Sequence, residues 1–76
     1  MKQKSFNISV VIEHDNDGYF AFSPELQGCY AQGESHEEAL ANIRDAIKLH
    51  LEDRIAEREE IPHAQSVTLS TVEVTV

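Results

Sequence analysis

The chain has 76 residues, a hydrophobic fraction of 41% and a formal net charge of -8. A single domain of this size buries only about 60% of the surface of its unfolded chain, so self-association would add stability. Six basic residues against fourteen acidic residues argue against direct nucleic-acid binding, which needs clustered Lys and Arg to neutralise phosphates. The same charge favours a basic protein partner.

The cysteine content and the N-terminal pattern both bear on where the protein works. The single cysteine, Cys29, cannot form an internal disulfide, so nothing favours a secreted, disulfide-bonded domain. The first residues lead into an alternating pattern rather than into the apolar stretch of a signal peptide. No run of residues approaches the length of a membrane-spanning helix. We therefore expect a cytoplasmic protein that makes no contact with a membrane.

The first half of the chain predicts a β-hairpin. Apolar and polar residues alternate over about residues 5–13, which is the period of a strand with one buried face. Residues 14–18 tolerate turn conformations, and an aromatic run over about 19–23 follows them as a second strand. Pro24 ends that strand because it has no backbone donor.

Two registers of this hairpin would place the phenylalanines on opposite faces of the sheet. A five-residue loop would pair Glu13 with Tyr19, and Phe20 and Phe22 would then share a face with Ile12. A shift by one residue would expose both rings. We expect the register that buries them.

A third strand and a helix follow. Residues 28–33 read as a short strand after a loop, and Ser35 with Glu38 forms a capping box for a helix over about residues 36–56. The apolar positions of that helix form one stripe that would pack onto the sheet. They are Leu40, Ile43, Ile47 and Leu51.

The last predicted element is a β-branched strand over about residues 66–75. Its apolar residues lie on odd positions up to Leu69 and on even positions from Val72 onward. One continuous half-buried strand cannot satisfy both halves. A bulge near Ser70 would reconcile them. Alternatively, the second half meets another subunit, in which case Val72, Val74 and Val76 are the expected dimerisation residues.

These elements predict an α+β domain with the element order β-β-β-α-β. The right-handed crossover rule favours a sheet of order 3-2-1-4, with the last strand beside the first and parallel to it. The helix covers one face of the sheet, so the other face is open for docking. We expect the partner to bind there. The expected contacts are Tyr19 and Tyr30 with the carboxylates Glu13 and Glu25.

Catalytic and metal sites find little support in the sequence. A metal-dependent nuclease would need converging carboxylates, and the candidates are Glu13, Asp17, Asp45 and Glu73. Asp45 lies off the apolar stripe, and the chain has few basic residues to hold nucleic acid. Cys29 in a short apolar strand is read as a packing residue. We predict no enzyme activity, no cofactor and no metal.

One run of sequence also resembles a known family. Residues 18–40 read GYFAFSPELQGCYAQGESHEEAL and are followed by an amphipathic helix. This pattern is similar to that of HicB antitoxins, and the similarity covers about residues 5–55. The most specific parts are PELQGC at 24–29 and QGE at 32–34 with EAL at 38–40.

The resemblance implies a partial ribonuclease H-like fold without nuclease activity, assembled as dimers or larger homo-oligomers. It also implies a partner, the small basic toxin HicA, which cleaves mRNA. Longer members carry a C-terminal DNA-binding domain after the last strand; the printed sequence shows none, so we expect no direct binding to DNA.

Three functions follow from these observations. The first is a non-enzymatic antitoxin of a type II toxin–antitoxin system that binds and masks a HicA-type toxin. The second is an orphan homodimeric module with a structural or ligand-binding role and no toxin. The third, a metal-dependent nuclease, requires magnesium-stimulated cleavage that is lost when Asp17 or Glu13 is replaced by Ala.

Overall fold

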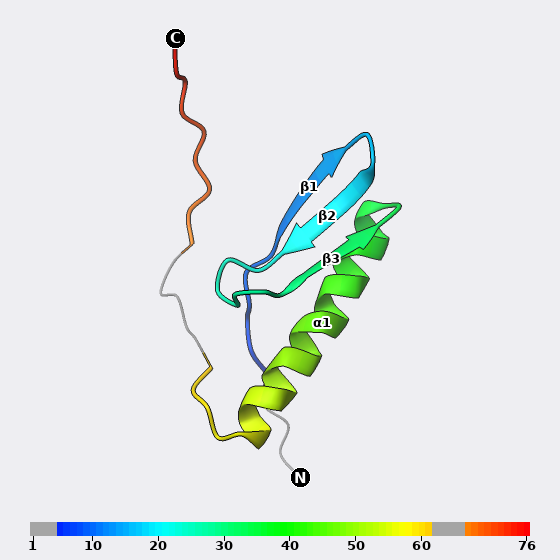
Figure 1. Ribbon diagram of the computed structural model, residues 1–76, viewed down its shortest axis with the longest axis vertical. Coiled ribbons are helices and arrows are strands. Elements are labelled where there is room, and N and C mark those ends of the chain that lie inside the picture. Colours follow the sequence, from blue (N-terminus) through cyan, green and yellow to red (C-terminus); the bar gives the residue numbers. More distant parts are fainter. Residues whose placement is uncertain (1–4, 62–66) are drawn as a thin grey trace.

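The computed structural model describes residues 5–61 and 67–76 of the chain. Its elements in chain order are β1 (Val11–Asp15), β2 (Gly18–Phe22), β3 (Tyr30–Gly33) and α1 (His36–Ala56). The strands form one antiparallel sheet in the order β1-β2-β3, and α1 lies across one face of it (Figure 1). The protein is therefore an α+β domain in which three antiparallel strands and one helix form two layers.

The β1–β2 hairpin turns through two residues, Asn16 and Asp17. The backbone N–H of Asp17 donates a hydrogen bond to the Asp15 carboxylate (2.8 Å), and Gly18 adopts a φ of 126°. A residue with a Cβ is strained at such a φ, so the glycine allows β2 to begin directly after the turn. This short turn fixes the register of the hairpin.

The predicted register of this hairpin is wrong by one residue. Glu13 pairs with Phe20 rather than with Tyr19, because the loop has two residues instead of five. Since side chains alternate along a strand, the shift turns Phe20 and Phe22 to the face away from α1. The small residue Ala21 takes the position beneath the helix, where it is fully buried.

The loop between β2 and β3 contributes to the core. The backbone N–H of Ser23 donates to the carbonyl of Cys29, and the N–H of Cys29 donates to the carbonyl of Leu26, both at 3.2 Å. Gly28 adopts a φ of 80°, which suits a residue without a side chain. These bonds hold the loop so that Leu26 is fully buried and Cys29 nearly so.

Helix α1 begins at a capped end and packs one side against the sheet. The Ser35 hydroxyl accepts a hydrogen bond from the backbone N–H of Glu38 (3.1 Å), which satisfies one of the free donors of the first turn. Near the other end, the Arg54 guanidinium lies 3.8 Å from Glu59. Within the described residues, no helix combines the length and the apolar character needed to span a bilayer. The buried residues of the helix are Ala39, Ile43, Ile47 and Leu51.

Two described segments outside the helix and strands, residues 5–10 and 67–76, bear on the predicted fourth strand. Residues 5–10 lead into β1, but β2 ends opposite Val11, so no described strand pairs with them. Residues 67–76 form no strand; Val67 and Leu69 lie near residues 9–12, and the segment then extends away from the sheet and past its end (Figure 1). The predicted fourth strand is thus not formed within 67–76, and Ser66 lies outside the described residues. The sheet order 3-2-1-4 and the ribonuclease H-like fold stay predictions.

Candidate partner-binding face

The sheet face opposite α1 carries two rows of side chains from all three strands. Cross-strand pairing places Val11, Phe22 and Tyr30 in one row, and Glu13, Phe20 and Gln32 in the next. Residues that face each other in this way share one side of the sheet. We call these six residues the aromatic face.

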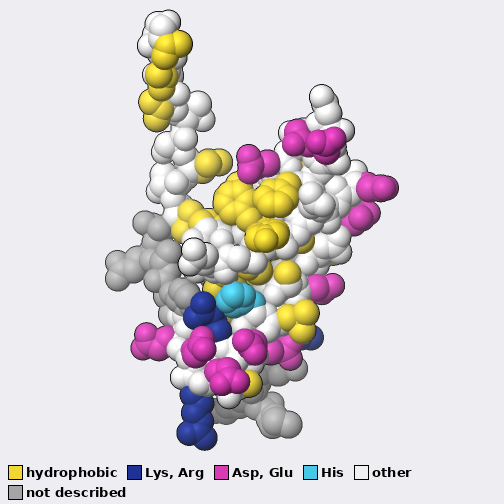
Figure 2. Space-filling model, in the orientation of Figure 1, with side chains coloured by type: hydrophobic (Ala, Val, Ile, Leu, Met, Phe, Trp, Pro, Cys, Tyr) yellow, Lys and Arg dark blue, Asp and Glu magenta, His cyan; other side chains and the backbone are white. Residues whose placement is uncertain are grey.

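The rings of the aromatic face lie close enough to form one cluster. The ring centroids of Phe20 and Phe22 are 6.3 Å apart, and those of Phe20 and Tyr30 are 5.9 Å apart, with tilted planes. These distances are typical of favourable aromatic pairs. Phe20 is 36% exposed and Tyr30 is 62% exposed. Figure 2 shows hydrophobic side chains gathered over the strands, with acidic side chains along their margin.

The charge around this face is of one sign. Residues 5–43 contain no Lys or Arg, and all four described basic side chains lie at or beyond Arg44. The same range contains seven carboxylates, so the sheet half of the molecule is uniformly acidic. An apolar centre with an acidic margin complements a basic partner. The seven are Glu13, Asp15, Asp17, Glu25, Glu34, Glu37 and Glu38.

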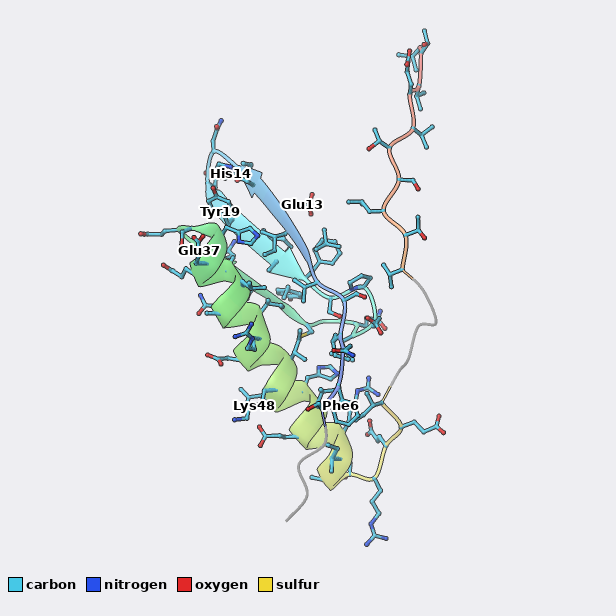
Figure 3. The ribbon with its side chains drawn as sticks, turned by 180° about the vertical axis from the view of Figure 1, so that it is seen from behind. Phe6, Glu13, His14, Tyr19, Glu37 and Lys48 are labelled. Atoms are coloured by element: carbon cyan, nitrogen blue, oxygen red, sulfur yellow. The ribbon has the colours of Figure 1, made fainter. Side chains whose placement is uncertain are left out.

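The four residues predicted to contact the partner do not all lie on the same face of the sheet. Glu13 and Tyr30 belong to the aromatic face. Tyr19 lies on the opposite face, where it is half-buried against the core, so its predicted exposure on the open face is wrong. The one-residue register shift is the cause. Its ring stacks on His14 at 4.0 Å, near the start of α1 and Glu37 (Figure 3).

Glu25 has a structural contact. Its carboxylate oxygen Oε1 accepts a hydrogen bond from the backbone N–H of Ser9 at 2.6 Å, which ties the β2–β3 loop to the segment before β1. The side chain is half-buried. Val72, Val74 and Val76, predicted for dimerisation, are exposed in the segment 67–76, which extends away from the sheet (Figure 1).

The sequence pattern missed Phe20 and Phe22 as surface residues. The signal that could have found them is Asn16-Asp17-Gly18, since short polar residues before a glycine favour a two-residue turn. Counting the turn as two residues would have given the observed register.

Neither a reactive cysteine nor a metal centre is assembled in the described part of the chain. Burial raises the pKa of the Cys29 thiol, which disfavours the reactive thiolate. Among residues 5–61 and 67–76, no three His, Cys, Asp or Glu side chains come together as a metal site.

A small α+β domain with an exposed aromatic sheet face and an acidic margin has a geometry that is common among protein-binding modules. The comparison with known families agrees with that class. The family model described as HicB-like antitoxin of bacterial toxin–antitoxin system matches residues 7–74. The chain belongs to this family.

Two proteins of similar sequence align with most of this chain. A UPF0150 protein of Helicobacter pylori (strain J99) is 45% identical over 67 residues, which is 88% of this chain and 93% of the relative. A UPF0150 protein of Synechocystis is 47% identical over 58 residues, 75% of this chain and 73% of the relative. No solved structure shows significant similarity to the chain.

A named antitoxin is also among the relatives. Antitoxin HicB 2 of Photorhabdus laumondii is 31% identical over 71 residues, which is 93% of this chain but 51% of the relative. The chain therefore corresponds to about half the length of that antitoxin.

Proposed function

We propose that this protein is the antitoxin of a type II toxin–antitoxin system and that it masks a small, basic, mRNA-cleaving toxin of the HicA type. The aromatic face is the docking surface. Family membership supports the antitoxin role, and the geometry of the face supports the mode of binding. In this proposal the protein acts without catalysis and in the cytoplasm.

The observation that carries the proposal is the aromatic cluster exposed on the sheet face that no described helix or strand covers. Phe20, Phe22 and Tyr30 project from adjacent strands, so the backbone holds their positions before any partner arrives. Rigid aromatic anchors at the centre of a contact surface contribute most of the binding energy in many protein complexes. The cluster therefore has the features of a binding hot spot.

Charge supports the choice of partner. A toxin that cleaves mRNA needs a basic surface for phosphates, and the acidic sheet half of this protein complements such a surface. Glu13 lies within the aromatic face beside Phe20, so it can pair with a Lys or Arg of the toxin. Covering that basic surface would exclude RNA from it.

A second candidate is a homodimeric module without a toxin. The exposed apolar side chains of residues 67–76 favour it, since they give the protein a surface for self-association. The two functions differ in one respect that can be measured, which is the binding of a basic toxin.

The test is co-expression with the small basic reading frame beside the gene, followed by binding measurements on the purified proteins. We expect the wild-type protein to rescue growth and to form a complex. Tyr30→Glu and Phe20→Glu should each weaken the complex by about tenfold or more, because each places a charge in the centre of the contact.

Leu49→Glu is the matched control. Leu49 is 70% exposed on α1, on the other side of the molecule from the aromatic face, and it should leave binding unchanged. Circular dichroism checks that all three variants fold. Absence of any complex, or equal weakening by all three variants, would refute the proposal.

A further inference from the structure

Residues 67–76, called the arm from here on, expose apolar side chains that folded proteins usually bury. Val72, Val74 and Val76 are each at least 75% exposed. They alternate with Glu73 and Thr75, so in an extended conformation the three valines line one side. The arm thus carries an apolar strip with nothing packed on it among the described residues.

A groove of about 740 Å³ lies between residues 5–10 and α1. Its walls are mainly apolar, and Arg44 and Lys48 add the aliphatic stems of their side chains. Phe6 and Lys48 mark the strand side and the helix side of the groove (Figure 3). The apolar lining residues include Phe6, Ile8, Val10, Ile43, Ile47 and Leu51.

Residues 5–10, which form the wall of this groove opposite α1, also have no strand partner among the described residues. The two-residue turn makes Asp15 and Gly18 a hydrogen-bonded pair, so the backbone groups of odd-numbered residues of β1 point toward β2. The bond from the Ser9 N–H to Glu25 follows the same pattern. Continued back into this segment, the same alternation would point the backbone groups of Ile8 and Val10 to the free edge. That edge can accept another strand.

We propose that the arm of a second copy of this chain fills the groove, with its residues 72–76 pairing as a strand with residues 6–10. Both segments span about 13 Å at roughly 3.3 Å per residue, so they match in length. The valines would face α1 from the same side as Phe6, Ile8 and Val10. A two-fold axis would let each copy give an arm and receive one.

A copy cannot easily place this part of the arm in its own groove. Val67 and Leu69 line a cavity with Ser9–Ile12, so the first half of the arm lies beside its own β1. The arm then continues past the end of the sheet, away from residues 5–10 (Figure 1). To return, it would have to reverse at Ser70 and Thr71, and residues 68–71 contain no Gly, Pro, Asn or Asp.

The first test measures molar mass by size-exclusion chromatography with light scattering, on the protein alone. The wild type should elute at twice the 8.6 kDa chain mass. Val74→Glu should raise the dimer dissociation constant at least tenfold, because it places a charge in the groove. Thr75→Glu adds the same charge on the other side of the arm and should stay dimeric. A monomeric wild type, or equal effects of both variants, would overturn the proposal.

The second test identifies which chain supplies the arm. In an antiparallel pairing of Val72 with Val10, Thr75 would stand opposite Asn7, so Asn7→Cys and Thr75→Cys chains, both with Cys29→Ala, should form a disulfide when mixed. A disulfide within one chain that carries both cysteines, or no disulfide at all, would contradict exchange. Both tests omit the toxin, so their outcome is independent of the toxin-binding proposal.

Discussion

At the scale of single residues, Gly33 sets the distance between the sheet and the helix. A Cβ added to Gly33 would collide with the backbone nitrogen of Ala39 and would lie 2.9 Å from its Cα. These are backbone atoms, so the clash could be relieved only by moving α1. Ala21 and Ala31 lie on the same face of the sheet. Small residues on both layers therefore allow the close packing of α1.

Replacing Gly33 by Ala should destabilise the folded protein far more than replacing Gly28 by Ala. We expect Gly33→Ala to lower the free energy of unfolding by about 2 to 3 kcal/mol, since overpacking a tight contact displaces the layers. Gly28 has a φ of 80° with open space around it, so Gly28→Ala should cost only about 1 kcal/mol of backbone strain. Urea denaturation followed by circular dichroism gives both values. Equal midpoints would show that the layers are not in tight contact at Gly33.

At the scale of elements, the start of α1 depends on one side chain. The Ser35 hydroxyl accepts from the Glu38 N–H, and Glu37 and Glu38 add negative charge at the positive end of the helix dipole. Three of the four buried residues of α1 follow this cap closely: Ala39, Ile43 and Ile47. The cap thus holds the part of the helix on which the core depends.

Ser35→Ala should lower the free energy of unfolding by about 1 kcal/mol, the usual cost of losing an N-cap side chain. Ser5→Ala is a suitable control, because Ser5 is exposed and lies in a segment without a strand partner. Thermal unfolding should show a lower midpoint for the first variant and an unchanged midpoint for the second. A midpoint for Ser35→Ala that equals the wild type would mean that water replaces the hydroxyl at no cost.

Three antiparallel strands followed by one helix could be predicted, because their signals are local. Ser35, Glu38 and the stripe from Ile43 to Leu51 lie within a few turns of one another. The hairpin register could not be predicted from apolar periodicity, since burying Phe20 and Phe22 satisfied the pattern equally well. The turn decided it: Asp15 pairs with Gly18 across two residues, and this register places Ala21 rather than a phenylalanine beneath α1.

The candidate site was predicted only in part for the same reason. An open sheet face with Glu13 and Tyr30 follows from the element order, whereas the place of Tyr19 depended on the register. Whether residues 67–76 pair with β1 of the same chain or with the sheet edge of another chain is a choice between contacts that are distant in sequence. A local pattern contains no information about that choice, although the change of phase at Ser70 indicated that one strand could not satisfy both halves.

At the scale of the whole molecule, the arm makes the shape unusually extended. The radius of gyration is 14.6 Å, whereas a compact chain of this length has a value of about 11 Å. The longest dimension is 53 Å and the shortest 18 Å. Covering the arm on a second copy would remove its exposed valines from water, and the aromatic faces would remain free. The two proposed interfaces would therefore be compatible on one molecule.

These two interfaces should respond to salt in opposite ways, and this response distinguishes them. The acidic sheet half should steer a basic toxin at long range, so raising NaCl from 0.05 to 0.5 M should slow association by about tenfold or more. The arm contact is apolar, so the same change should leave the dimer intact or strengthen it slightly. Stopped-flow mixing with the toxin measures the association rate, and light scattering measures the dimer in the same buffers. A toxin association rate that is independent of salt would mean that the charge of the sheet half has no part in recognition. A dimer that dissociates as salt is added would mean that charged groups, rather than the valines of the arm, hold the two copies together.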